Sequence, residues 1–126
     1  MYAGIAKITL GLSESHSLKD KRMVLRRIRD RVRERLGVAV NEVGAHDSWQ
    51  RAELGCAVVS GERAKVNEVL DDVLRVAGAA ALEGGAVIAA IARDVQTFTA
   101  ESAPYADKPA GDDGWIPDAW REEADS

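Results

Sequence analysis

The sequence is poor in cysteine and aromatic residues, and it has no long uninterrupted hydrophobic run. Its single thiol, Cys56, cannot form an internal disulfide, which favours the reducing cytoplasm. No stretch approaches the roughly 20 apolar residues that span a bilayer. The N-terminal apolar segment is interrupted by Lys7 and lacks a signal-peptide cleavage pattern. These absences predict a cytoplasmic protein with no membrane partner.

Acidic and basic side chains are distributed unevenly along the 126 residues, whose net charge is −4. Residues 99–126 contain eight of the 21 acidic residues but only two of the 17 basic residues. Residues 1–98 therefore have a net charge of +2. The same tail holds all three prolines and two of the three tryptophans. We therefore expect one domain over residues 1–98, followed by an acidic tail over residues 99–126 that is extended or docked.

Hydrophobic periodicity predicts six secondary-structure elements. Apolar and polar residues alternate at the start of the chain, as in a half-buried strand, whereas spacings of three and four residues later on are typical of amphipathic helices. Ser17 suits the N-cap of the first helix, with Asp20 three residues later, and Gly37 suits its C-terminal end. The expected elements are, in order, strand 2–12, helix 18–36, strand 38–43, strand 52–60, helix 62–79 and strand 86–98.

This order predicts an α+β, ferredoxin-like split βαββαβ fold, in which a four-stranded antiparallel sheet carries two helices on one face. The other face must meet water or another subunit. We expect that face to be less charged than a fully solvated sheet, which indicates a homodimer. Its expected residues are Lys7, Thr9, Asn41 or Val43, Glu53 and small residues of the last strand.

The first predicted helix is strongly basic, with nine Lys or Arg and three acids in residues 18–36. Arginines spaced by four, three and four residues fall on one face, and guanidinium groups bind phosphate bidentately. The helix therefore predicts contact with structured RNA, the ribosome included. The predicted RNA-binding residues are Lys19, Lys21, Arg22, Arg26, Arg29 and Arg33.

The alternative is a solvated helix whose arginine stems cover the edge of the core, with Asp30 and Glu34 in local ion pairs. Base stacking on the sheet, as in RRM domains, is not expected, because the run 52–60 has no aromatic residue. If RNA binds, the helix is its expected site.

Two histidines have competing interpretations. His16 precedes the helix N-terminus, where an anion pocket is conceivable, but we favour a simple helix cap. His46 lies beside Asp47, as in a general base with its orienting acid, yet no nucleophile accompanies the pair. We therefore predict no catalytic residues and no enzymatic activity. His16, His46 and Cys56 lack the spacing of metal ligands, so neither a metal nor a cofactor is expected.

The simpler interpretation of residues 46–51 is a hairpin loop. In that interpretation Trp49 covers the core, and Arg51 pairs with Glu53 or Asp47.

The tail contains Trp115, Ile116 and Trp120 in an acidic setting, and a purely solvating tail has no use for exposed indoles. One interpretation is a docking peptide for a partner protein. Another is that the tail folds back, with its acids on the basic helix and its indoles on the open sheet face. A third is that the indoles cover an apolar surface of the same subunit or of a dimer mate.

Three segments together resemble the small bacterial YlxP-like family of unknown function: HSLKDKR (16–22), EVGAHDSWQRAELGCAVVS (42–60) and VNEVLDDVLRV (66–76). The resemblance covers about residues 1–98. It implies a ferredoxin-like fold and a cytosolic bacterial setting near RNA metabolism, and it supplies no catalytic residues. We expect a non-enzymatic, RNA- or ribosome-associated protein. The alternative is a docking or dimeric adaptor module that uses the open sheet face and the C-terminal tryptophans.

Overall fold

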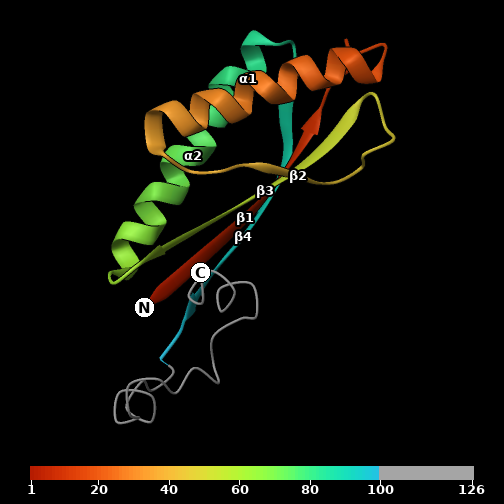
Figure 1. The fold of residues 1–126 in the computed structure, drawn as a ribbon. Coiled ribbons are helices and arrows are strands. Elements are labelled where there is room, and N and C mark those ends of the chain that lie inside the picture. The colour runs from red at the N-terminus through yellow and green to blue at the C-terminus, as the bar shows by residue number, and fades with distance from the viewer. Residues whose placement is uncertain (100–126) are drawn as a thin grey trace, which may run out of the picture.

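A computed structural model describes residues 1–99 and contains all six expected elements (Figure 1). They are β1 (Tyr2–Gly11), α1 (Leu18–Leu36), β2 (Asn41–Gly44), β3 (Arg51–Ser60), α2 (Arg63–Glu83) and β4 (Val87–Thr97). Residues 100–126 lie outside the described part. The predictions made for the acidic tail, and for Trp115, Ile116 and Trp120 within it, therefore stay predictions.

The four strands form one antiparallel sheet in the order β2-β3-β1-β4. β1 is central and pairs along its whole length with both β3 and β4. Both helices cover the same face of this sheet (Figure 1). Two βαβ units with right-handed crossovers give this order. The predicted ferredoxin-like split βαββαβ fold is confirmed.

The core lies between the sheet and the two helices. Side chains alternate on a strand, so the even-numbered residues of β1 point toward the helices, and Ile8 and Leu10 are fully buried. They pack with the apolar stripe of α1, formed by Leu25, Ile28 and Val32, and with the apolar face of α2. Burying each large apolar side chain contributes roughly 1.5–3 kcal/mol. This packing fixes α1 and leaves its opposite surface in water.

Two element boundaries differ from the prediction by more than one residue. α2 continues to Glu83 instead of ending near residue 79, because the run of alanines is strongly helix-forming and Ala80 and Ala81 pack into the core. β2 begins at Asn41 instead of residue 38. The preceding Val40 is buried in the core and lies outside the ladder that β2 forms with β3.

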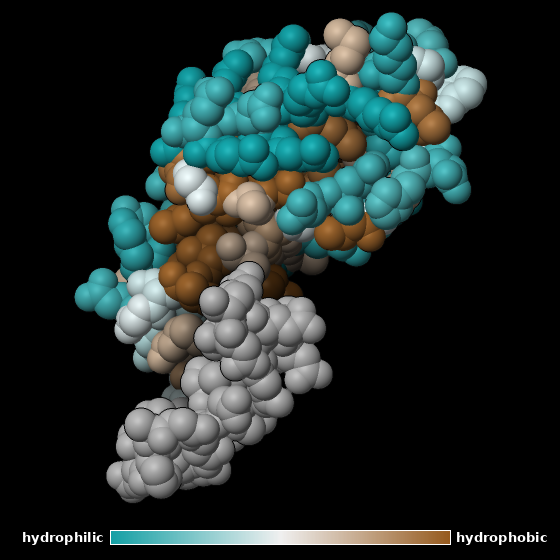
Figure 2. All heavy atoms as spheres, in the orientation of Figure 1, coloured by the Kyte–Doolittle hydropathy of each residue, from teal (hydrophilic) through white to brown (hydrophobic). Residues whose placement is uncertain are grey.

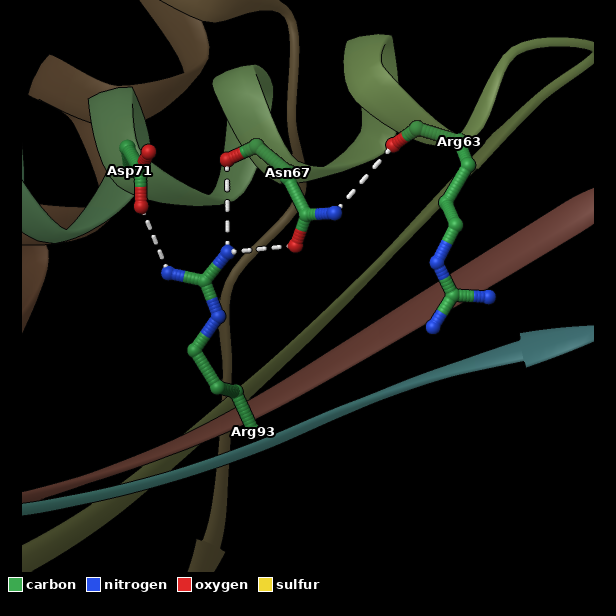
Figure 3. A network of polar contacts seen from close by, with 4 residues as sticks. All are labelled: Arg63, Asn67, Asp71 and Arg93. Atoms are coloured by element: carbon green, nitrogen blue, oxygen red, sulfur yellow. Dashed lines mark hydrogen bonds and ion pairs between the residues drawn. The ribbon is translucent and has the colours of Figure 1, made fainter.

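The edge strand β4 is fastened to α2 by a polar network around Arg93 (Figure 3). One guanidinium nitrogen of Arg93 lies 2.6 Å from Asp71 Oδ1, and the other donates to the Asn67 carbonyl and side-chain oxygens at 3.3 and 3.1 Å. The Asn67 amide in turn donates to the carbonyl of Arg63. These contacts are exposed, so they position the edge strand more than they stabilise it.

The uncovered face of the sheet carries large apolar side chains in water. Ile5 on β1 and Val59 on β3 are 53% and 63% exposed, and both occupy the odd-numbered positions that face away from the helices. Lys7 and Thr9 on β1, and Glu53 opposite Thr9 on β3, lie on the same side as expected. A sheet face with so few charges is unusual for a solvated surface.

Candidate nucleic-acid interface

The N-terminus of α1 is closed by its own side chains. The Ser17 hydroxyl accepts a hydrogen bond from the Asp20 backbone N–H at 3.1 Å, and the Asp20 carboxylate accepts one from the His16 N–H at 3.0 Å. This is the reciprocal pattern of a capping box, although here the acid bonds the residue before the cap. The interpretation of Ser17 as the N-cap is confirmed. The place of an anion beside His16 is already taken by the Asp20 carboxylate.

Four arginines of α1 form a row on the flank of the helix that faces β2. We call Arg22, Arg26, Arg29 and Arg33 the arginine stripe. The first three line a hollow of about 200 Å³ together with Glu42, and Arg33 continues the row one turn further on. Within residues 1–99 none of the four forms an ion pair with an acid. Hydrophilic side chains cover the surface over α1 (Figure 2). Arg22, Arg26 and Arg33 are exposed and Arg29 is partly exposed, so the described residues leave this row open to an external anion.

The opposite flank of α1 faces α2, and there Arg31 is paired with an acid, whereas Arg27 and Arg35 form no ion pair within residues 1–99. The Arg31 guanidinium donates to both carboxylate oxygens of Glu83 on α2, at 3.0 and 3.4 Å. These hydrogen bonds lower the pKa of the Glu83 carboxyl, with smaller help from the charges of Arg27 and Arg35. The same pair raises the pKa of Arg31. Arg31 therefore links the two helices.

The alternative interpretation is a solvated helix in which Asp30 and Glu34 neutralise the arginines through local ion pairs. Asp30 and Glu34 form no ion pair within the described part of the chain. The charge of the arginine stripe is therefore not cancelled by acids on the same helix.

Lys21 does not belong to this surface, and its prediction as an RNA contact is wrong. Its side chain is only 2% exposed. The ammonium group donates to the carbonyls of Ala45 and Ser48 at 2.7 and 2.8 Å and lies 2.9 Å from Glu42 Oε2. Glu42 Oε2 is buried and accepts no hydrogen bond of standard geometry from the described residues, so its contact with Lys21 is ionic. Lys21 fastens the β2–β3 loop to α1. Lys19, by contrast, is exposed.

The β2–β3 loop is also fastened to the segment that precedes α1. The Leu12 N–H donates to the Gln50 carbonyl at 2.9 Å, and the Gln50 side-chain amide reaches the carbonyls of Ser13 and Ser15 at 3.4 and 3.5 Å. Together with Lys21, these contacts join two of the segments that carry the family resemblance. Their meeting point is a structural junction next to the arginine stripe.

The predicted cover of the core by Trp49 is wrong. The indole is 52% exposed, because the contacts that hold the loop come from its backbone and from the flanking Ser48 and Gln50. Sequence patterns carry no signal for this exposure, since the loop has no periodicity. Arg51 is predicted to pair with Glu53 or Asp47, and it pairs with Glu53 at 3.0 Å.

His46 and Asp47 lie exposed at the tip of the same loop. Their turn is closed by a hydrogen bond of 3.1 Å from the Ser48 N–H to the Ala45 carbonyl. Within residues 1–99 no hydrogen bond joins the imidazole to the carboxylate. The geometry provides no oriented base, and the absence of enzymatic activity stays a prediction.

Other reactive groups are few in the described residues. Cys56 is half-buried on β3, and burial raises the pKa of its thiol, which keeps the thiol protonated and makes it a poor nucleophile.

Among residues 1–99 no group of three side chains that could hold a metal ion is found. None of the described helices is long and apolar enough to cross a membrane.

A hollow of about 710 Å³ lies between the β1–α1 loop and the end of α2. Its wall combines the apolar side chains of Met23 and Leu82 with the acids Glu14 and Glu83. Because acids line it, this hollow suits a polyanion less well than the arginine stripe does.

The fold and this surface define a ferredoxin-like α+β protein with a basic flank on its first helix. The chain belongs to the family described as "Protein of unknown function (DUF503)", whose model matches residues 3–93. It is similar to the "Uncharacterized protein YlxP" of Bacillus subtilis (strain 168), with 39% identity over 71 residues that cover 56% of this chain and 77% of the relative. The resemblance to a YlxP-like family is confirmed.

Two solved structures share a weaker likeness. One is a C-terminal segment of the alpha subunit of aIF2 from Pyrococcus abyssi, with a TM-score of 0.45 and 15% identity over 79% of this chain. The other is the YXEP protein of Bacillus subtilis, a dinuclear metal binding peptidase from the M20 family, with a TM-score of 0.44 and 13% identity over 74% of this chain. This chain spans about half of the first and a quarter of the second.

Proposed function

We propose that this protein binds structured RNA through the arginine stripe of α1. The observation that carries the proposal is the row of four arginines, unpaired within residues 1–99, on one flank of the helix. Arg31 is held by Glu83, whereas the four stripe arginines have no acid partner within residues 1–99. Guanidinium groups in a row bind phosphates bidentately and with little sequence preference.

The length of the stripe matches several phosphates. Arg22 and Arg33 are eleven residues apart in α1, which corresponds to about 17 Å along the helix axis at 1.5 Å per residue. A strand of double-stranded DNA carries a phosphate about every 3.4 Å along its axis, and on that spacing the stripe spans about five phosphates. Lys19 extends the same surface toward the N-terminus of the helix. Ribosomal RNA is one structured RNA of this chemistry.

A salt series with matched variants of the full chain tests the proposal. Fluorescence anisotropy with a labelled RNA hairpin should give an affinity that falls steeply with salt. The double variant R26Q/R33Q should lower the slope of log K against log salt by about 1.4–1.8, if each lost contact contributes about 0.7 in the loop or 0.9 in the paired stem of the hairpin. The control R27Q/R35Q removes the same charge from the α2 side, where these two arginines also form no ion pair within residues 1–99, and should leave the slope unchanged.

Binding that is absent or indifferent to salt would overturn the proposal. Equal losses of slope in the two double variants would also overturn it, because they would show a response to net charge alone and not to the stripe.

A second candidate function is self-association through the open sheet face. Ile5 and Val59 are more than half exposed there, and the face carries both Lys7 and Asp94, whose opposite charges let two copies pair across a two-fold axis. Analytical ultracentrifugation should show a dimer that the variant V59K converts to a monomer. A monomeric parent protein at high concentration would remove this candidate.

A further inference from the structure

Trp49 is a large aromatic side chain that is half exposed to water and lies outside both core clusters of the described residues. It is the only tryptophan within residues 1–99, and it is 52% exposed. Leaving an indole in water forgoes the stabilisation that its burial brings, and an exposed aromatic outside the core is a recurrent mark of ligand contact.

The loop that presents Trp49 is anchored on both sides of the indole. The Ser48 carbonyl accepts from the buried ammonium group of Lys21 at 2.8 Å. The Gln50 carbonyl accepts from the Leu12 N–H at 2.9 Å. The residue between two anchored neighbours has a fixed backbone, so its indole is presented at little cost in conformational entropy.

The loop adjoins the N-terminal end of the arginine stripe. Lys21 contacts the loop, and Arg22 follows it directly in α1. Glu42 meets Lys21 and also lines the hollow of the first stripe arginines. Figure 1 shows the β2–β3 loop at the end of the molecule where α1 begins. An aromatic plane and a row of phosphate-binding groups are therefore neighbours.

Other exposed surfaces of the described residues do not offer this combination. On the open face, the outward positions of β1 and β3 from Ala3 to Thr9 and from Glu53 to Val59 carry no aromatic side chain. Phe98 is 56% exposed, but it follows β4 at the end of the sheet where β1 starts, away from the first turn of α1.

We propose that Trp49 is a stacking platform for an unpaired RNA base whose neighbouring phosphates lie on the arginine stripe. This inference rests on the proposed function and adds its substrate class: RNA with single-stranded nucleotides, in a loop, a bulge or a free strand. Sequence-tolerant recognition of such RNA combines aromatic stacking with a basic track.

The test compares two probes with the same number of phosphates, a short oligouridylate and a fully paired RNA duplex. In the full chain, W49A should weaken oligouridylate binding about ten-fold or more, the effect of losing one stacked base, and leave duplex binding unchanged. W49F, which keeps an aromatic ring, should retain most of the affinity. The matched control F98A removes an equally exposed ring and should have no effect, and circular dichroism should show that each variant is folded.

The outcomes separate this inference from the proposed function. Oligouridylate affinity that W49A leaves intact, while R26Q/R33Q reduces the salt slope, would overturn the stacking platform and keep the stripe. Equal losses on both probes in W49A would also overturn it, since a duplex offers no free base. Absence of salt-dependent binding by the parent protein would overturn both.

Discussion

Replacing Lys21 with alanine should destabilise this protein far more than the loss of any other lysine on α1. The substitution removes two hydrogen bonds from a charged donor and the ionic partner of Glu42. Glu42 Oε2 would then be a buried carboxylate oxygen with no compensating charge in the described residues. Truncation also leaves a cavity where the lysine stem was, because the side chain is 2% exposed.

The magnitude follows from the burial of the two partners. Breaking a buried ion pair by removing one partner costs about 3–5 kcal/mol. The Glu42 side chain is 23% exposed and regains some water, so we take the lower end, about 3 kcal/mol. For a domain of this size each kcal/mol shifts Tm by about 4–8 °C, which gives a fall of about 12–24 °C.

Urea unfolding and thermal unfolding of the full chain, followed by circular dichroism, measure this change. K19A is the matched control, since Lys19 is exposed on the same turn of α1, and it should change stability by less than about 0.5 kcal/mol. The double variant K21M/E42Q should recover part of the loss, because an apolar stem and a neutral amide leave no unpaired charge. A loss below about 1 kcal/mol for K21A, the range of a surface pair, would refute the reasoning.

Three further predictions concern other parts of the fold. G4A should lose about 1–3 kcal/mol in urea unfolding, because the new Cβ would lie 2.8 Å from Leu70 Cδ1, while G61A, with open space around it, should not show overpacking. Glu83 has a lowered pKa in the folded state, so its stabilising effect is present above the unfolded pKa and is lost as the pH falls through the folded value; Tm measured on acidification should fall less steeply in E83Q than in the parent. Ala45 has a φ of 57°, so A45G should raise stability by about 1 kcal/mol in thermal unfolding.

Local patterns were sufficient to predict the architecture. The alternation in β1, the three- and four-residue spacing in α1 and the capping residue Ser17 all reflect contacts within a few residues, and each is confirmed. The boundaries of β2 depend on its register with β3 and on the burial of Val40, both of which are long-range. For this reason periodicity placed the start of that strand three residues early.

The errors at the candidate site have the same physical origin. Lys21 shares a helix face with Leu25, Ile28 and Val32. The sequence shows this, because these positions are separated by four, three and four residues, the spacing of one face of a helix. A lysine on an apolar stripe is therefore a signal of burial, but its partners are backbone carbonyls 24 and 27 residues away that no local pattern reveals. The exposure of Trp49 likewise follows from how its loop is anchored, which is decided by tertiary contacts.

The buried Lys21 has a consequence for the proposed interface. An apolar residue at this position could pack α1 against the sheet at least as well, because burying a charge costs free energy that its partners only partly return. An ammonium group differs in that it fixes the positions of two particular carbonyls, including that of Ala45 in its left-handed conformation. Lys21 therefore specifies the shape of the loop more than it stabilises the fold. The residues on either side of these contacts, Arg22 and Trp49, are the ones left free to meet a ligand, so the buried junction sets the distance between the aromatic plane and the arginine stripe.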